Sequence, residues 1–201
     1  MNWTFDRRVG KGSRRTRKVC LIAGAILACL FLPAVGMGGW ALGLQLVGNI
    51  HVVEPGHLYR AAQLNGAALD DVLDHYGIRT VINLRGANEG KDWYDNEIAV
   101  TRKHGLIHLD VRMSATSEPD EATVAKLIQD LRASPGPILI HCQSGSDRTG
   151  FASALYERFV AHHSITEAAG QLSFWYGHFP WLGSRTIAMD NAFERIAATV
   201  R

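Results

Sequence analysis

The stretch PILIHCQSGSDRTG, residues 137–150, decides how the rest of this 201-residue chain is interpreted. Residues 137–141 form an apolar run that is typical of a buried strand. Residues 148–162 have the pattern of a helix, and the loop between the two contains Gly145, where the backbone can turn without the obstruction of a Cβ atom. The stretch therefore predicts a strand that ends in a tight loop and continues directly into a helix.

Short β-branched runs alternate with helical patterns on both sides of this stretch. The expected strands cover residues 80–84, 106–111 and 137–141. The expected helices cover residues 67–76, 93–104, 119–131, 148–162 and 184–200, with one more opened by the capping pair Ser164 and Glu167. This alternation predicts an α/β fold with a mainly parallel central sheet flanked by helices. Residues 49–59 are expected only to lead into the domain, with a turn at Pro55-Gly56.

A long uncharged segment precedes the α/β region. Lys, Arg, Asp and Glu are all absent between Lys18 and Glu54, a stretch of 35 residues, and residues 19–32 are almost wholly apolar. A helix needs about 20 apolar residues to cross the hydrocarbon core of a bilayer. We therefore expect an N-terminal transmembrane helix. Residues 1–50 then form a basic cytoplasmic tail and membrane anchor, and residues 51–201 form one soluble domain.

Charge gives the expected orientation of this helix. Residues 1–18 contain seven Lys and Arg residues, which should stay cytoplasmic under the positive-inside rule. The domain that follows is then expected on the extracytoplasmic, periplasmic side of a single-pass membrane protein. A cleaved signal peptide is the alternative, because Ala41-Leu42-Gly43 offers small residues at the spacing of a cleavage site.

Composition excludes several other classes of protein. Hydrophobic residues make up 47% of the chain and charged residues 20%, which excludes wholesale disorder. Residues 19–201 carry 14 basic and 18 acidic residues, so no nucleic-acid partner is expected. Cys20 and Cys29 lie in the apolar segment, which leaves Cys142 as the one cysteine of the soluble part and excludes a disulfide scaffold.

Residues 142–148 have the features of an anion-binding loop. Their peptide N–H groups can curl inward around one centre, and the N-terminus of the following helix adds its dipole. These dipoles and Arg148 would hold Cys142 as a thiolate. The planar Arg148 guanidinium can hold two phosphate oxygens, and Thr149 can donate to the Cys142 sulfur. Cys142 and Arg148 are therefore predicted to be catalytic, and the predicted substrate-binding residues are Gln143, Ser144, Gly145, Ser146, Asp147 and Thr149.

This arrangement predicts phosphoryl transfer through a cysteinyl-phosphate. A thiolate attacks phosphorus, the leaving alcohol receives a proton, and water then hydrolyses the intermediate. The loop N–H groups and Arg148 stabilise the charge on the equatorial phosphate oxygens. No metal and no cofactor is expected, because this chemistry needs none and no cluster of metal-ligating residues stands out in the sequence.

The signature His141, Cys142, five residues, Arg148 and Thr149 resembles that of the cysteine-dependent protein tyrosine phosphatase superfamily. The chain is most similar to the bacterial dual-specificity-type phosphatases and their atypical fungal and plant relatives, and residues 58–63 and 77–86 support this likeness. The resemblance covers roughly the soluble domain up to residue 180. It implies a phosphatase-like fold and a tyrosine or dual-specificity phosphatase activity.

The resemblance also implies a general acid, usually an Asp on a mobile loop before the cysteine. Asp110 is the favoured candidate, since it lies 32 residues before Cys142 and ends a predicted strand. Glu118 and Asp120 lie nearer the tip of the loop 112–120, although both suit a helix N-terminus without any role in catalysis. Asp147, directly before the arginine, resembles the lipid-directed branch of the superfamily and is the remaining candidate.

Phosphorylated proteins, on tyrosine or on serine and threonine, are the leading predicted substrates. Phosphoinositides or inositol phosphates are the alternative, given Asp147 and the membrane helix, although Ser146 replaces the Lys of many lipid-directed relatives. A phosphate-binding module without catalysis and a rhodanese-type sulfur transferase are further alternatives. The complete set of His141, Cys142, Arg148 and Thr149 favours the phosphatase.

Three other features carry weaker expectations. His141 is expected to order the loop through hydrogen bonds rather than to transfer protons. Arg85 follows the strand of residues 80–84 and is expected either to touch substrate or to form a structural ion pair. The aromatic residues of 174–181 are expected to pack in the core or against the helix that follows Cys142, with a wall on the substrate side as the alternative.

Overall fold

The computed structural model describes residues 11–199, including their side chains except for residues 11–15 and 30. The expected basic tail up to residue 10 and the expected end of the last helix at Val200 lie outside the described residues. The chain divides into two compact units, Met1–Leu42 and Gly43–Arg201.

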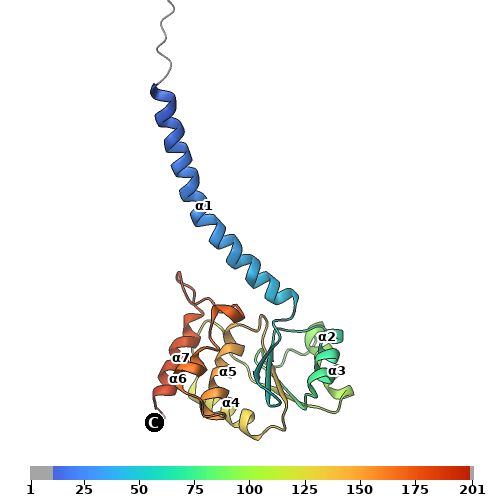
Figure 1. Ribbon diagram of the computed structural model, residues 1–201. Coiled ribbons are helices and arrows are strands. Elements are labelled where there is room, and N and C mark those ends of the chain that lie inside the picture. The colour runs from blue at the N-terminus through green and yellow to red at the C-terminus, as the bar shows by residue number, and fades with distance from the viewer. Residues whose placement is uncertain (1–10, 200–201) are drawn as a thin grey trace, which may run out of the picture. The chain divides into compact units, whose positions relative to one another are not determined.

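The described part of the first unit, residues 11–42, belongs to one long helix. The helix α1 (Lys11–Leu46) continues through Pro33 (Figure 1). Its segment Thr16–Leu46 has a mean hydropathy of 2.5 and is long and apolar enough to cross a bilayer. Most of its large apolar side chains are exposed, as those of a membrane helix would be, and a signal sequence has the same properties.

The second unit is an α/β domain around a mixed five-stranded sheet, in the order β1-β2-β5-β3-β4. The strands are β1 (His51–Glu54), β2 (Leu58–Ala61), β3 (Thr80–Asn83), β4 (Ile107–Asp110) and β5 (Ile138–His141). All neighbouring strands are parallel except β1, which pairs antiparallel with β2. Every residue of β2, β3 and β5 is buried, as parallel strands covered on both faces require.

Helices cover both faces of the sheet (Figure 1). One face carries α2 (Gly66–Tyr76) and α3 (Asp92–Lys103), and the other carries α4 (Glu121–Ala133), α5 (Asp147–Phe159), α6 (Ile165–Ala169) and α7 (Ile187–Thr199). The larger core lies on the second face, where Phe151, Leu155 and Phe193 are almost completely buried. Because α5 packs against β5, α4, α6 and α7, the loop that precedes α5 adjoins a firmly held helix.

Residues 49–59 differ from the expectation. They form β1 and the start of β2, an antiparallel hairpin rather than a simple lead-in, with the expected turn at Pro55-Gly56 between the strands. Both strands have four residues, and the pairing is irregular between Val52 and Glu54, so the sequence shows no clear alternation there. The other expected elements are present within a few residues of their predicted bounds, and Ser164 and Glu167 form the expected capping box of α6.

Candidate active site

The Cys142 loop, residues 142–148, leaves the sheet at the carboxyl end of its central strand. β5 has β2 on one side and β3 on the other, and the loop runs directly into α5. Ligands of α/β sheets bind at this edge, because strand ends and helix N-termini meet there. The order of strand, loop and helix agrees with the prediction from residues 137–150.

Four consecutive carbonyls of this loop, those of residues 143 to 146, are held from outside. The Gln63 N–H donates to the first (3.2 Å) and the Asn49 side-chain amide donates to the second (2.9 Å). The Arg60 guanidinium donates to the third and fourth (2.8 and 3.3 Å). By contrast, no main-chain N–H of residues 144–148 donates to another group within the described part of the chain. The loop thus keeps its donors available for an anion.

Arg60 is the main support of the Cys142 loop. This side chain of β2 is completely buried, and its other terminal nitrogen donates to the main-chain and side-chain oxygens of Gln171 (2.9 and 2.7 Å). Its Cζ lies 4.0 Å from the centre of the Tyr176 ring. Burial lowers the pKa of Arg60 to about 10, against the opposing effect of nearby Tyr176 and Cys142, so the guanidinium stays charged at neutral pH. A fixed positive charge therefore lies behind the loop.

Gly145 is required in this loop for two separate reasons. Its φ of +73° is a left-handed conformation that residues with a side chain rarely adopt. A Cβ atom at this position would also lie 2.7 Å from the Ala62 nitrogen and 2.8 Å from the Ala61 carbonyl carbon. The loop can lie against the end of β2 only because this atom is missing.

Two side chains at the base of the loop, Cys142 and Thr149, are almost fully buried, and a third, Arg148, is partly buried. Cys142 is 1% exposed. Arg148 donates to the carbonyls of Met113 (3.3 Å) and Leu84 (3.5 Å), both long contacts, and its buried Nε has no partner among the residues described. The hydroxyl of Thr149 is likewise buried without a partner in that set, so the predicted bond from Thr149 to the Cys142 sulfur is not formed here. Buried donors without partners are costly, so these two atoms call for an explanation that the described residues do not supply.

A sequence model described as the tyrosine phosphatase family matches residues 42–164, which include the whole sheet and the Cys142 loop. The chain belongs to this family. The match confirms the resemblance deduced from His141, Cys142, Arg148 and Thr149.

Solved structures support the same fold for this family member. TpbA from P. aeruginosa, solved with phosphotyrosine, has a TM-score of 0.58 and 21% identity, over 75% of this chain and 89% of that chain. The core catalytic domain of the PP-IP phosphatase SIW14 from S. cerevisiae, solved with citrate, gives 0.55 and 20%, over 75% and 91%. PTPMT1 in complex with PI(5)P gives 0.52 and 18%, over 76% and 99%. The expected phosphatase-like α/β fold is therefore confirmed.

Asp110, the favoured candidate for the general acid, ends the edge strand β4. Its Oδ1 accepts from the Asn83 amide (2.8 Å) and its Oδ2 accepts from the Tyr94 hydroxyl (2.7 Å). Burial and this carboxylate raise the pKa of Tyr94 far above its usual range, so Tyr94 remains a donor. Within the described residues, these partners come from β3 and α3 rather than from the Cys142 loop. The acid role of Asp110 stays a prediction.

Glu118 and Asp120 have surface contacts that explain them without catalysis. Glu118 pairs with Arg195 of α7 at 3.0 Å, with both side chains largely exposed. Asp120 is the N-cap of α4 and accepts from the Thr123 N–H (2.7 Å). Asp120 therefore has the helix N-terminal role that was the alternative expectation, whereas Glu118 forms an ion pair with another helix instead.

Asp147 is the one general-acid candidate within the loop itself, and it belongs to a buried clamp. Its Oδ1 lies 2.8 Å from His178 Nδ1, and His178 Nε2 lies 2.8 Å from Oδ2 of Asp190 on α7. Burial lowers the pKa of His178, but the two carboxylates outweigh burial and raise it to about 9. The imidazole is therefore charged at neutral pH, and one oxygen of Asp147 is committed to it.

A second buried network holds the strand end before Cys142. His141 Nε2 lies 3.0 Å from Glu97 Oε1, and Glu97 also accepts from the Gln63 amide (2.7 Å) and contacts His108 (2.8 Å). Burial opposes the charge on Glu97, but the two histidines and Gln63 hold its pKa well below the usual range. His141 thus has the expected ordering role. Glu97 was not identifiable from sequence, because α3 lies far from the Cys142 loop along the chain.

Arg85 is held by an aromatic ring and an amide. Its Cζ lies 3.6 Å from the centre of the Trp93 ring, and its Nη1 donates to the Gln63 side chain (3.3 Å). These partners, rather than the expected ion pair, are the ones found within residues 11–199. A contact with substrate stays a prediction.

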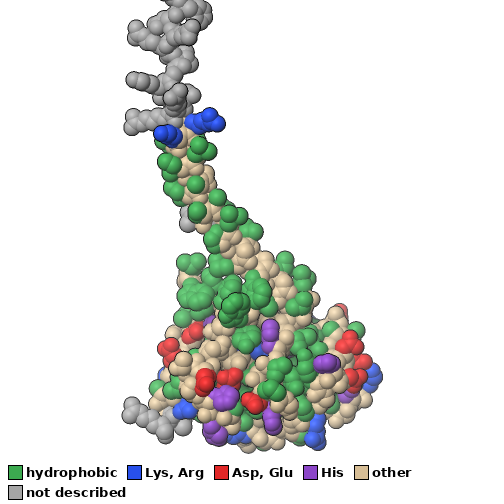
Figure 2. Space-filling view, in the orientation of Figure 1, with side chains coloured by type: hydrophobic (Ala, Val, Ile, Leu, Met, Phe, Trp, Pro, Cys, Tyr) green, Lys and Arg blue, Asp and Glu red, His purple; other side chains and the backbone are tan. Residues whose placement is uncertain are grey.

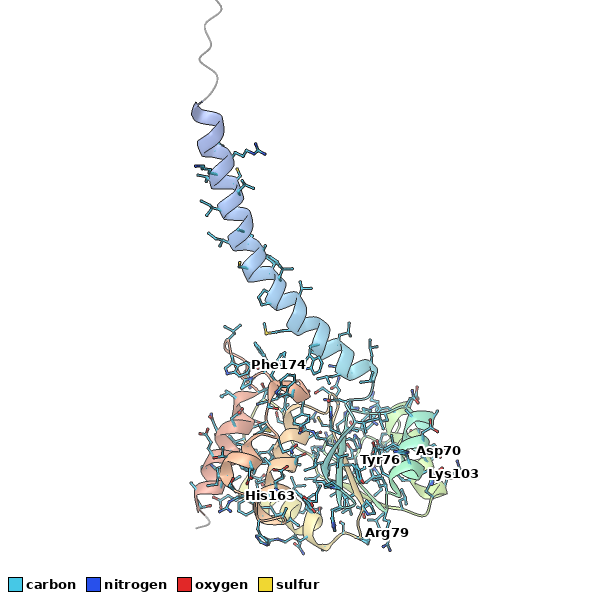
Figure 3. The ribbon with its side chains drawn as sticks, in the orientation of Figure 1. Asp70, Tyr76, Arg79, Lys103, His163 and Phe174 are labelled. Atoms are coloured by element: carbon cyan, nitrogen blue, oxygen red, sulfur yellow. The ribbon has the colours of Figure 1, made fainter. Side chains whose placement is uncertain are left out.

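The one group of side chains in the described region that could hold a metal ion lies away from the Cys142 loop. Ligand atoms of Asp70, Asp74 and His104 lie within 4.8 Å of one another on α2 and at the end of α3. Lys103 already pairs with Asp70 at 2.9 Å, and Figure 3 shows these two side chains next to each other. The ammonium group neutralises part of the charge that a cation would need.

Proposed function

We propose that this protein is a metal-independent phosphomonoester phosphatase that acts through a cysteinyl-phosphate at Cys142. The observation that carries this proposal is the polarity of the Cys142 loop. Gln63, Asn49 and Arg60 donate hydrogen bonds to its carbonyls from outside the loop. The main-chain N–H groups of residues 144–148 are left for an anion. Donors fixed in this way stabilise the charge of a phosphoryl group without reorganising during the reaction.

The reaction is proposed to run in two steps. The Cys142 sulfur attacks phosphorus and forms an S–P bond, the ester O–P bond breaks, and the departing oxygen takes a proton from the general acid. Water then attacks phosphorus, the S–P bond breaks, and inorganic phosphate and the thiolate are released. Arg148 and the loop N–H groups hold the equatorial oxygens of the phosphoryl group.

Replacement of Cys142 and Arg148 tests this chemistry. Cys142→Ser should abolish turnover of p-nitrophenyl phosphate, and rapid acid quenching of the parent protein with a ³²P-labelled substrate should trap the label on Cys142. Arg148→Lys keeps a charge but loses the planar fork, so kcat/KM should fall by roughly a hundredfold or more. Turnover that survives Cys142→Ser would contradict the proposal. Thiosulfate activity without phosphatase activity would favour the sulfur transferase.

Asp110 is proposed as the general acid and Asp147 as the second candidate. Substrates with different leaving groups distinguish these two candidates, because p-nitrophenolate departs without a proton and an alkoxide needs one. Loss of the true acid should lower kcat for an alkyl or phenyl phosphate by about 10²–10⁴-fold and leave p-nitrophenyl phosphate much less affected. We expect this pattern for Asp110→Asn, and finding it for Asp147→Asn instead would reverse the assignment.

Two substrate classes remain candidates. Phosphorylated proteins are the leading class from sequence, and the phosphotyrosine complex of TpbA supports them. Phosphoinositides or inositol phosphates are supported by Asp147 before Arg148, by the PI(5)P complex of PTPMT1 and by the apolar helix α1. Parallel assays of the full chain on a phosphotyrosine peptide and on PI(5)P compare the two directly.

We also propose that α1 anchors the protein in a membrane once, with the phosphatase domain on the extracytoplasmic side. The length and hydropathy of Thr16–Leu46 support the anchor, and the basic residues before it support the orientation. A C-terminal reporter that folds only outside the cytoplasm should be active, and a reporter that is active only in the cytoplasm would contradict this topology.

A further inference from the structure

Residues 174–182, called the aromatic segment, expose large apolar side chains beside the Cys142 loop. The segment begins with the short 3-10 helix Phe174–Tyr176 and lies between α6 and α7. Trp175 is 70%, Trp181 54% and Leu182 92% exposed, so the expected packing into the core does not hold for them. Figure 2 shows hydrophobic side chains gathered along the upper edge of the domain, the edge where Figure 3 places Phe174.

The charge around the aromatic segment is also unusual. No Asp or Glu occurs from residue 168 to residue 189, and Arg185 is the only Lys or Arg in that range. Trp and Tyr residues favour the interface between lipid and water, where one side of the ring meets hydrocarbon and the other meets headgroups. An apolar surface flanked by a single cation suits phospholipids better than water.

The aromatic segment is tied to the end of the apolar helix. Asn49 is buried, and its side-chain amide donates both to the Tyr176 carbonyl (3.0 Å) and to the Ser144 carbonyl of the Cys142 loop (2.9 Å). Leu44 also packs here, since a Cβ on Gly177 would lie 3.4 Å from its Cδ1. One side chain therefore joins the aromatic segment, the Cys142 loop and the chain that leaves α1.

Chain geometry then limits how far this junction lies from the helix end. α1 ends at Leu46, three residues before Asn49. Three residues span at most about 10 Å of extended chain. Leu46, the last residue of the helix, is 78% exposed, and Val47, directly after it, is 70% exposed. Both belong to the same compact unit as the aromatic segment. A membrane that holds α1 up to Leu46 therefore has its surface within about this distance of the junction.

We propose that the aromatic segment docks on the bilayer that holds α1 and keeps the Cys142 loop at the level of the lipid phosphates. This proposal rests on the phosphatase function and deepens it. The substrate class that follows is the phosphomonoester headgroup of a membrane lipid, because docking at that depth places such headgroups next to the loop. Confinement to one surface also raises their effective concentration without any new contact to the phosphate.

The test uses the full chain in phosphatidylcholine nanodiscs and one headgroup in two forms. Long-chain PI(5)P resides in the disc, and its dibutanoyl analogue stays in water. The double variant Trp181→Ser, Leu182→Ser should lower kcat/KM for the long-chain lipid about tenfold and leave the soluble analogue and p-nitrophenyl phosphate unchanged. The matched control is Ile107→Ser, which removes a 42% exposed apolar side chain from β4 and should change neither. Equal effects on both substrates, or no effect on either, would overturn the docking.

A second measurement reports docking without any catalysis. Brominated acyl chains quench tryptophans at the membrane interface, so the quenched share of fluorescence should fall in Trp181→Phe relative to the parent protein. Trp93→Phe, on α3, is the control and should leave the quenched share unchanged. Unaltered quenching in Trp181→Phe would refute the docking, whether the aromatic segment faces water or a second copy of the chain.

The same assays distinguish a failure of the docking proposal from a failure of the proposed phosphatase function. If the parent protein fails on every phosphomonoester, the proposed function is wrong, and quenching alone decides the docking. If the protein hydrolyses a lipid-tethered phosphotyrosine peptide in the discs but not PI(5)P or phosphatidic acid, the lipid substrate class is wrong.

Discussion

At the scale of single residues, the missing Cβ of Gly145 lets the Cys142 loop lie against β2. The left-handed φ alone makes a side chain costly at this position, and the close approach of Ala61 and Ala62 adds a clash with main-chain atoms that cannot move cheaply. A similar left-handed φ of +79° without the close approach occurs at Gly90, where nothing lies within 4 Å of the missing Cβ.

Gly145→Ala should therefore impair both folding and catalysis. We expect the free energy of unfolding to fall by about 1–3 kcal/mol and kcat/KM to fall at least tenfold, because the loop N–H groups shift. Denaturant titration and turnover of p-nitrophenyl phosphate measure the two effects. Gly90→Ala is the matched control and should cost the backbone penalty alone, with activity retained. Equal activity in the two variants would contradict the role of the close approach.

Arg60 is expected to affect catalysis by holding the Cys142 loop, because its guanidinium binds two carbonyls of the loop. Arg60→Lys keeps the charge but cannot bridge the carbonyls of Gly145 and Ser146 and the two oxygens of Gln171 in one plane. We expect kcat to fall by roughly ten- to a hundredfold with a smaller change in KM, measured on p-nitrophenyl phosphate. The exposed Arg79→Lys is the control. Unchanged kcat would show that other bonds suffice to hold the loop.

At the scale of elements, His178 fastens three parts of the domain together. Its two nitrogens connect Asp147, the first residue of α5, with Asp190 of α7, and His178 itself follows the 3-10 helix of residues 174–176. Both ion pairs exist only while the imidazole is charged. The clamp therefore makes the packing of α5 and α7 sensitive to pH.

Stability should fall as the pH rises through the folded-state pKa of His178. That pKa is raised to about 9 from 6.5, so the stabilisation is complete below about pH 6.5 and is lost above about pH 9. The difference corresponds to roughly 3 kcal/mol of unfolding free energy, measured by denaturant titration at both ends of this range. Asp190→Asn should weaken the pH dependence of the unfolding free energy, and Glu194→Gln, at an exposed position on the same helix, should preserve it. A pH-independent parent protein would refute the charged clamp.

At the scale of the whole molecule, the apolar helix α1 is the proposed membrane anchor of the phosphatase domain. Thr16–Leu46 has the length for a bilayer and no charged residue after Lys18. Retention of this helix and cleavage near residues 41–43 give different products, which differ in mass and in location.

Purified protein should have the intact mass of 22.1 kDa and stay in the membrane fraction at alkaline pH. The double substitution Ile26→Arg, Leu27→Arg should shift the protein to the soluble fraction, because each Arg costs about 2.5–3.5 kcal/mol at the centre of a membrane helix. Leu27→Phe is the control and should change nothing. A shorter mature chain in the soluble fraction would show that the helix is a cleaved signal.

The sequence by itself determined the features that depend on neighbours along the chain. The run at residues 137–150 is a local strand, loop and helix, so the spacing of Cys142 and Arg148 predicted the anion loop and the family. Uncharged composition alone predicted α1, because crossing a bilayer depends on hydropathy and length. The sequence did not predict the short hairpin of β1 and β2, since irregular four-residue strands have too little alternation to be recognised.

Only the tertiary structure decided which side chains hold the loop in shape. Asn49 and Arg60 reach it across 95 and 85 residues of sequence, and Glu97 reaches His141, directly before it, across 44 residues. Each does so with a buried polar group. Such contacts leave no local pattern, because a buried donor or charge is stable only where the packed fold supplies its partners. For the same reason the fold, and not the sequence, left the Thr149 hydroxyl without a partner among residues 11–199 and tied Asp110 to Asn83 and Tyr94.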